Sequence, residues 1–150
     1  MKAVSESTWT FQIIIFFILI FACFLVLVLS YNKAYTIKNR TLSIIEKYEG
    51  ITPTSAELLN DYISNKGYTN KGKCPDGWMG AINLQGDFEL AKTNNTYYYC
   101  FKEESKNNKV YYDIKVFYKF NLPIIGDIMN YQIDGTTKTF LGADDRIKEQ

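Results

Sequence analysis

The most constraining feature of the sequence is an apolar run close to its N-terminus. Over residues 11–29 the only polar residue is Gln12, and 16 of these 19 residues are Ile, Leu, Phe or Val. A helix over residues 9–31 would be about 34 Å long, enough to cross a hydrocarbon core of ~30 Å with some tilt. Trp9 and Tyr31 stand at its two ends, where interfacial aromatic residues are common. The run therefore predicts a transmembrane helix.

This segment could be removed as an export signal or kept as an anchor. A cleaved signal has an apolar region of about 7–15 residues followed by small residues at the cleavage site, and "LVLSYNKAY" offers no such site. The stretch "IFAC" resembles a lipoprotein signal, but apolar residues continue beyond Cys23. We therefore expect a retained segment with Cys23 inside it. The expected order is a short tail at 1–8, a transmembrane helix at 9–31 and an extracytoplasmic α+β domain at 32–150.

The helix is expected to continue beyond the membrane. Apolar and small residues recur there at steps of three and four, as in an amphipathic helix, while the charged residues avoid that face. The recurring positions are Ala34, Ile37, Thr41, Ile44, Ile45 and Tyr48. Gly50 predicts the end of the helix. This second half of the helix should pack on the domain that follows it.

A second helix is predicted beyond Gly50. The sequence "TSAE" after Pro53 has the form of a capping box, with Thr54 as the N-cap and Glu57 as the third helical residue. This helix should end before Gly67, where a loop-like composition begins.

The clearest strand signal is "VYYDIKVFYKF" (110–120), whose side chains alternate with the period of a half-buried strand. "TYYYCFK" (96–102) precedes it across the polar stretch "ESKNN", and "MNYQIDGTTKTF" (129–140) follows it. The turn "QGD" (85–87) would return "WMGAINL" into "FELAK". The sequence therefore predicts an α+β fold, in which the long N-terminal helix packs on a small antiparallel sheet of four or five strands.

The cysteines and the basic residues give opposing indications of membrane orientation. Cys74 and Cys100 are the only cysteines outside the apolar run, and a disulfide between them would close a loop of about 27 residues. Disulfides persist in oxidising compartments, which places the domain outside the cytoplasm. Lys33, Lys38 and Arg40 follow the apolar run, and basic residues favour the cytoplasmic side. We expect a single-pass cell-membrane protein with the bulk of the chain extracytoplasmic.

Composition argues against several function classes. The formal net charge is +1 and no basic stripe is interleaved with aromatic residues, so a nucleic-acid partner is not expected. The sequence has no His, which removes the commonest general base and metal ligand near neutral pH. No nucleophile is paired with a base and no phosphate-binding glycine motif is present. We expect no enzyme activity, no catalytic residue, no metal and no cofactor.

The segment "NLPIIGDI" (121–128) is unusual for a link between two strands. It carries Leu122, Ile124 and Ile125 around Pro123. These side chains could fold over the end of the sheet, or they could contact a neighbouring subunit, because exposed apolar clusters commonly mark contact surfaces. Both interpretations stay open.

The order of these features is similar to the type IV pilin plan. The stretch "KVFYKFNLPIIGDIMNYQIDGTTKTF" (115–140) resembles the end of TadE-like minor pseudopilins of tight-adherence systems. Glu6, ahead of the apolar run, resembles the acidic residue that pilins keep near the mature N-terminus. The resemblance implies a non-enzymatic subunit of a bacterial envelope filament or of a secretion or adhesion assembly. Its partners would be membrane lipid and other pilin-like subunits or an assembly platform. The implied assembly contacts are Glu6, Leu122, Pro123, Ile124 and Ile125.

An alternative function is a membrane-anchored binding or sensory module. In that case a tyrosine-rich sheet would serve as the recognition face, because tyrosine supplies contact area at a low cost in conformational entropy. The candidate residues are Tyr97, Tyr98, Tyr99, Tyr111 and Tyr112. Likewise, Glu6 could simply rest among lipid headgroups rather than pair with a neighbouring subunit.

Overall fold

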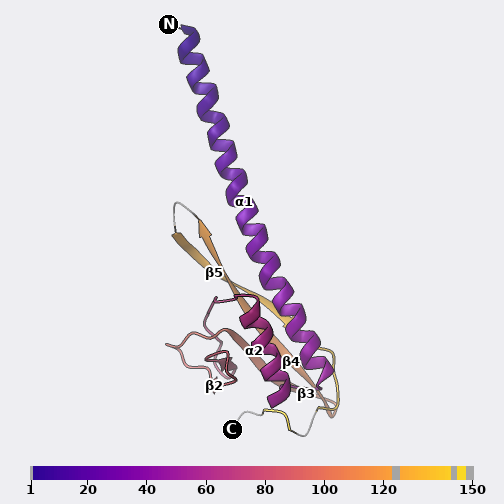
Figure 1. Cartoon of the computed structure of the whole chain (residues 1–150). Helices are drawn as coiled ribbons and strands as arrows, with labels where there is room; N and C mark the ends of the chain where they lie inside the picture. Colours follow the sequence, from indigo (N-terminus) through magenta and orange to yellow (C-terminus); the bar gives the residue numbers. More distant parts are fainter. Residues whose placement is uncertain (1, 123–125, 143–144, 148–150) are drawn as a thin grey trace.

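The computed structural model describes residues 2–122, 126–142 and 145–147. Within these residues, two helices and five strands make an α+β fold, which confirms the predicted class (Figure 1). The elements in chain order are α1 (Lys2–Lys47), α2 (Pro53–Asn65), β1 (Met79–Ala81), β2 (Phe88–Leu90), β3 (Tyr99–Lys106), β4 (Lys109–Leu122) and β5 (Gly126–Thr136).

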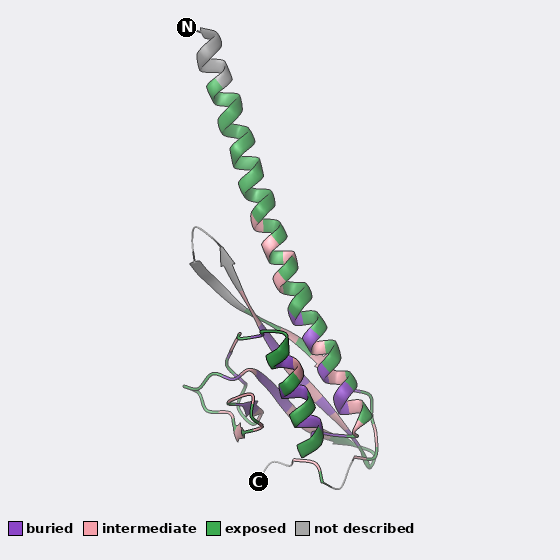
Figure 2. Cartoon of the chain, in the orientation of Figure 1, coloured by how far each residue is buried: buried purple, intermediate pink, exposed green. Residues whose placement is uncertain are grey.

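Helix α1 is a single helix of 46 residues whose two halves are packed differently. Its N-terminal half stands clear of the other elements, and its C-terminal half lies on the sheet beside α2 (Figures 1 and 2). Burial begins at Ala34 and follows the predicted face, which includes Ile37, Thr41 and Ile45. The helix ends before Gly50, as the sequence predicts. Gly50 has a φ of 145°, a backbone conformation that other residues adopt only with strain.

The start of α2 differs from the prediction. Thr52, and not Thr54, is the N-cap, and its side chain accepts a hydrogen bond from the backbone N–H of Ser55 at 3.2 Å. The Ser55 hydroxyl accepts one from the backbone N–H of Thr52 at 2.8 Å, which completes a capping box without Glu57. Pro53 decides the matter, because proline favours the first helical position and forces the residue before it into an extended conformation.

The five strands form one antiparallel sheet in the order β2-β1-β3-β4-β5. Strands β3 and β4 form a hairpin through Asn107 and Asn108, whose positive φ values of 54° and 59° are those of a type I′ turn. Strands β1 and β2 pair as the "QGD" turn predicts. The pairing of β4 with β5 shifts register between Phe120 and Asn121.

Both faces of the sheet carry apolar clusters. On one face Tyr112, Ile114 and Val116 of β4 belong to the main core, together with the buried residues of α1 and α2. A second, smaller cluster contains Cys74, Tyr97, Cys100 and Phe117. The sequence pattern predicts the first cluster only. The second forms because the segment between α2 and β3 folds back over the sheet.

Candidate functional site

Among the described residues, the N-terminal half of α1 presents an extensive exposed apolar surface. From Thr8 to Lys33 no residue is buried, although the most apolar stretch has a mean hydropathy of 3.4. Trp9 is 71 % exposed and Leu29 is 67 % exposed. Among the described residues α1 is the one helix long and apolar enough to span a membrane. An apolar helix with no protein packed around it fits a lipid environment.

A cluster of tyrosines lies where this exposed stem meets the head domain, defined here as residues 32–147. Tyr31 stacks on Tyr35 at 6.0 Å between ring centroids and meets Tyr118 of β4 edge-on, also at 6.0 Å. Tyr118 stacks in turn on its cross-strand partner Tyr131 at 5.3 Å. The ammonium group of Lys38 lies 4.4 Å from the centre of the Tyr35 ring. Aromatic residues with one polar end are suited to a membrane–water interface.

A hydrogen bond holds the other side of the stem to the head. The Lys33 ammonium group donates to the carbonyl oxygen of Gly67 at 3.1 Å. Gly67 follows α2 in a left-handed conformation, so the loop after α2 is tied to the first turn of α1 beyond the apolar run. Together with the Tyr31–Tyr118 contact, this bond fixes the direction in which the stem leaves the head.

The described residues cover the predicted assembly contacts only in part. Glu6 lies in α1 ahead of Trp9, and its side chain is outside the described residues. Leu122 ends β4 opposite Gly126 of β5. The free end of this strand pair points along α1 toward its N-terminal half, and the N-terminus lies well beyond it (Figure 1). Pro123, Ile124 and Ile125 lie outside the described residues, so their contact role stays a prediction.

The predicted cysteine pair is bridged. The Cα atoms of Cys74 and Cys100 are 5.6 Å apart, within the range of a relaxed disulfide. The bridge fastens the loop after α2 to β3, and Phe117 and Tyr97 pack beside it. Gly72 lets the loop approach closely, because a Cβ atom there would lie 2.2 Å from the Phe117 ring. The remaining cysteine, Cys23, is free and lies in the apolar half of α1.

The tyrosine-rich recognition face is not available as predicted. Tyr97, Tyr99 and Tyr112 are at most 1 % exposed, and only Tyr98 and Tyr111 are partly exposed. The buried rings belong to the two clusters, where tyrosine acts as a large core residue. The alternation of strand residues could not separate these roles, because both faces of the sheet are covered.

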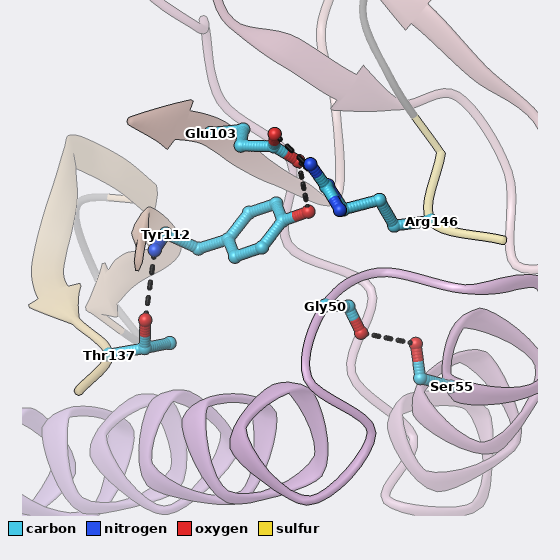
Figure 3. Close-up of polar contacts among 6 residues, drawn as sticks. All are labelled: Gly50, Ser55, Glu103, Tyr112, Thr137 and Arg146. Carbon is cyan, nitrogen blue, oxygen red and sulfur yellow. Dashed lines mark hydrogen bonds and ion pairs between the residues drawn. The ribbon is translucent and has the colours of Figure 1, made fainter. Parts of the chain in front are cut away.

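A network of polar groups close to the C-terminal end of the described chain is structural. Arg146 donates from Nε to both carboxylate oxygens of Glu103, at 3.1 and 3.0 Å (Figure 3). The Tyr112 hydroxyl donates to the same carboxylate at 2.5 Å. Burial raises the pKa of Tyr112 most, and the hydrogen bond to the Glu103 carboxylate raises it further. The phenol therefore stays protonated. Arg146 belongs to the C-terminal segment and Glu103 to β3, so the network fastens that segment to the sheet.

The carboxylate of Glu89 is likewise fully engaged in hydrogen bonds within the fold. Glu89 accepts hydrogen bonds from Lys92, Asn95 and Tyr97, at 2.9, 2.6 and 2.8 Å respectively. These bonds, that of Lys92 foremost, lower the pKa of Glu89 to about 2. The Glu89 carboxylate, on β2, is thus a fixed anion whose hydrogen bonds hold the segment after that strand. Within the part of the chain that the structure describes, no three His, Cys, Asp or Glu residues are grouped to hold a metal ion.

The residues that join stem to head were missed from the sequence. Tyr31 and Tyr35 show the spacing of neighbours on a helix, and Tyr118 and Tyr131 lie on two predicted strands. The contact between the two pairs depends on where α1 crosses the sheet, which no local pattern contains. Gly135 marks that crossing, because a Cβ atom there would lie 2.9 Å from Lys38 Cδ and 3.0 Å from Leu42 Cδ1.

Comparison with known proteins found no matching family model, no matching curated protein and no matching solved structure.

Proposed function

We propose that the chain is a non-enzymatic, single-pass membrane subunit that carries its head domain outside the cytoplasm and joins a pilin-like assembly. One observation carries the proposal. A single unbroken helix is apolar and exposed from Thr8 to Lys33 and forms part of the head core from Ala34 onward. Such a helix can anchor the subunit in lipid and later pack against the same helix of neighbouring subunits. The finer proposal is a TadE-like minor pseudopilin of a bacterial envelope assembly.

The disulfide supports the proposed orientation. A bridge between Cys74 and Cys100 persists outside the cytoplasm and is reduced within it. In intact cells, a membrane-impermeant thiol reagent should label both cysteines only after reductant has been added. Cys23→Ala removes the one remaining thiol and gives the background. Two free thiols that are shielded until lysis would place the head in the cytoplasm and contradict the orientation.

Assembly is tested by cross-linking through the N-terminal end of α1. In a Cys23→Ala background, Ser7→Cys places one reactive thiol close to Glu6. A bismaleimide should join wild-type subunits in native membranes, and Glu6→Ala should reduce the cross-linked fraction several-fold. Glu57→Ala makes the same chemical change on the exposed side of α2 and should leave the fraction unchanged. Equal cross-linking of the Glu6→Ala protein would remove Glu6 from the assembly contacts.

The Tyr-rich binding module is not proposed as a second function, because the tyrosines on which it depended are mostly buried. The retained proposal uses the exposed helix, which is the one extensive apolar surface among the described residues.

A further inference from the structure

Strands β4 and β5 continue as a pair beyond the rest of the sheet. Tyr99, where β3 begins, pairs with Val116, and past this point the described partner of β4 is β5. The pairing of β4 with β5 reaches Leu122, which lies opposite Gly126. A two-stranded ribbon is only marginally stable in water and becomes stable by packing against another surface. The far end of this strand pair therefore needs a surface to lie against.

This far end, defined here as residues 120–122 and 126–129 and called the hairpin end, is mostly apolar in sequence. Its one charged residue is Asp127, and four of its seven residues are large and apolar, namely Phe120, Leu122, Ile128 and Met129. Such a composition is typical of segments that lie at the boundary between lipid headgroups and acyl chains, where apolar groups leave water and a charged group keeps contact with it.

Two contacts fix the level of the hairpin end along α1. The ring of Tyr118 lies 6.0 Å from the ring of Tyr31, between centroids. One residue further along β4, Lys119 lines the same groove as Val26 and Ser30 of α1. Strand β4 therefore runs beside the end of the apolar run as it leaves the head. The hairpin end lies beyond Lys119, and the strand pair points along α1 toward its N-terminal half (Figure 1).

The hairpin end consequently lies on the membrane side of Tyr31. With the apolar run in the hydrocarbon core, Tyr31 lies in the interfacial layer, which is about 5–7 Å thick on each side of the bilayer. Leu122 is four residues beyond Tyr118 on β4, a length of ~13 Å in a strand. Even a strand inclined by about 60° to the membrane normal would carry Leu122 about 6 Å deeper than Tyr118. The hairpin end thus reaches the boundary between headgroups and acyl chains.

The backbone limits how deeply the hairpin end can enter the bilayer. In a two-stranded ribbon the outer edge of each strand carries N–H and C=O groups that no strand satisfies, and such edges are not found in the hydrocarbon core. Water and lipid headgroups can satisfy these groups at the interface. The carboxylate of Asp127 sets the same limit, because a charge is costly among acyl chains. The expected depth is therefore that of the interface.

We propose that the hairpin end of β4 and β5 inserts into the headgroup–acyl boundary of the membrane beside α1, as a second membrane contact of the head. Its partner is the lipid bilayer and not a neighbouring subunit. Attachment at two places, α1 and the hairpin end, holds the head at a fixed tilt to the membrane surface. The proposal rests on the proposed membrane anchoring by α1 and does not require assembly with other subunits.

The test uses nitroxide spin labels on the full-length protein in vesicles of phosphatidylcholine and phosphatidylglycerol, with lipid in large excess. In a Cys23→Ala background, Leu122→Cys and Ile128→Cys each place one label on one strand of the hairpin end. Molecular oxygen concentrates in lipid, whereas a neutral nickel chelate stays in water, so their relative effects on spin relaxation report the surroundings of the label. At both positions the effect of oxygen should exceed the effect of nickel.

Two control positions separate the hairpin end from the anchor. Ser105→Cys places the label on an exposed residue at the opposite end of β4, where nickel should have the larger effect. Leu25→Cys places it on an exposed residue of the apolar run, where oxygen should have the larger effect. A larger effect of oxygen at Leu25→Cys but of nickel at both hairpin positions would overturn the hairpin contact alone. A larger effect of nickel at Leu25→Cys as well would overturn the membrane anchoring together with it.

Contact with protein gives a different result from contact with lipid. Labels at Leu122→Cys and Ile128→Cys that are shielded from both oxygen and nickel would lie against protein, which would overturn the lipid contact in favour of a neighbouring subunit or of the sheet itself. Near-ultraviolet circular dichroism identifies a labelled variant whose head is unfolded. Because the two labels lie on different strands, a folding defect at one position leaves the other as the test.

Discussion

The ring of Tyr31 meets the ring of Tyr118 edge-on, with 6.0 Å between centroids and an interplanar angle of 85°. Tyr31 ends the apolar run on α1, and Tyr118 lies on β4 near the centre of its pairing with β5. The contact therefore connects the apolar half of α1 directly to the sheet. The direction of the stem is part of the packed structure of the head, since the Lys33–Gly67 hydrogen bond holds the same turn of α1 from the loop after α2.

A double-mutant cycle should detect this contact. We expect Tyr31→Ala and Tyr118→Ala to be coupled by about 0.5–1.5 kcal/mol in the free energy of unfolding, the range for aromatic pairs. The measurement is urea unfolding of the full-length protein in detergent, followed by near-ultraviolet circular dichroism. The same cycle between Tyr31 and Phe140, whose ring stacks on Tyr112 in the core, gives the control. Additive effects for Tyr31 and Tyr118 would show that the rings are adjacent without interacting.

Gly72→Ala should destabilise the head strongly. Its new Cβ atom would lie 2.2 Å from the Phe117 ring, so the loop or the ring must move and the disulfide cluster must open. We expect a loss of about 3 kcal/mol in the free energy of unfolding, at the upper end of the range for overpacked core sites. Gly77→Ala is the matched control. Its φ of 75° costs a side chain about 1–2 kcal/mol, but no atom lies within 4 Å of the new methyl group. A larger loss for Gly77→Ala than for Gly72→Ala would show that the close approach of Gly72 to Phe117 is not what limits stability.

The sequence predicted the elements that long periodic patterns specify, and it missed the features that depend on contacts between distant residues. The apolar run of α1 and the alternation along β4 are long and periodic, and both gave elements that the structure confirms. The cap of α2 was misplaced by two residues, because "TPTS" offers two threonines and the choice between them depends on Pro53. The second cluster was missed, because Gly72, Tyr97 and Phe117 meet only after the loop folds back over the sheet.

The candidate site was less predictable than the fold. The apolar half of α1 is a property of composition, so the sequence alone indicates a helix long and apolar enough to span a membrane. The tyrosines and lysines of the junction come from α1, the loop after α2, and β4, so their meeting is decided by the angle at which the helix crosses the sheet. Phe117 did offer a signal, as an aromatic residue among the polar positions of β4, and pointed to a covered reverse face.

Removal of the disulfide should lower stability by an amount that the loop length predicts. Closure of a loop of about 27 residues is worth ~3.5 kcal/mol on the chain-entropy estimate, so Cys74→Ala/Cys100→Ala should unfold that much more easily. Reduction of the wild-type protein should give a similar loss. Cys23→Ala, in the apolar half of α1, should change the free energy of unfolding of the head by less than about 0.5 kcal/mol. An unchanged urea midpoint after reduction would mean that the loop is held without the bridge.

The head should lose stability in alkaline solution. Burial raises the pKa of Tyr68, Tyr99 and Tyr112 above the value of about 10 found in unfolded chains. Their contribution is therefore complete below about pH 10, and it declines above that pH because the unfolded chain releases protons that the folded head retains. Each retained proton lowers the free energy of unfolding by about 1.4 kcal/mol per pH unit.

The variant Tyr99→Phe tests this loss of stability above about pH 10. Tyr99 is buried, and its hydroxyl donates to Asn60 Oδ1 at 3.2 Å. The variant should lose about 1 kcal/mol at neutral pH with the hydrogen bond, and its stability should decline less steeply between about pH 10 and 11, by the equivalent of one proton. Urea unfolding at several pH values measures both effects. Parallel alkaline profiles for the variant and the wild-type protein would show that Tyr99 ionises without unfolding the head.

Ile44→Asp should unfold the head while leaving the apolar half of α1 helical. Ile44 is 6 % exposed in the core between α1 and the sheet, and a carboxylate there would be desolvated without a partner. We expect a loss of at least about 3 kcal/mol in the free energy of unfolding. Ile44→Val removes one methylene and should cost only about 0.5–1.5 kcal/mol. Ser43→Asp adds the same charge at the neighbouring exposed position and should stay within about 0.5 kcal/mol of the wild-type protein.

The same variant separates the two halves of α1. Because the apolar run lies wholly outside the head core, Ile44→Asp should still partition with membranes as completely as the wild-type protein, even though its head melts. Membrane fractionation, together with protease sensitivity of the head, reports the two properties independently. If Ile44→Asp were released from membranes, the anchor would depend on the folded head, and the division of α1 into a lipid half and a core half would be wrong.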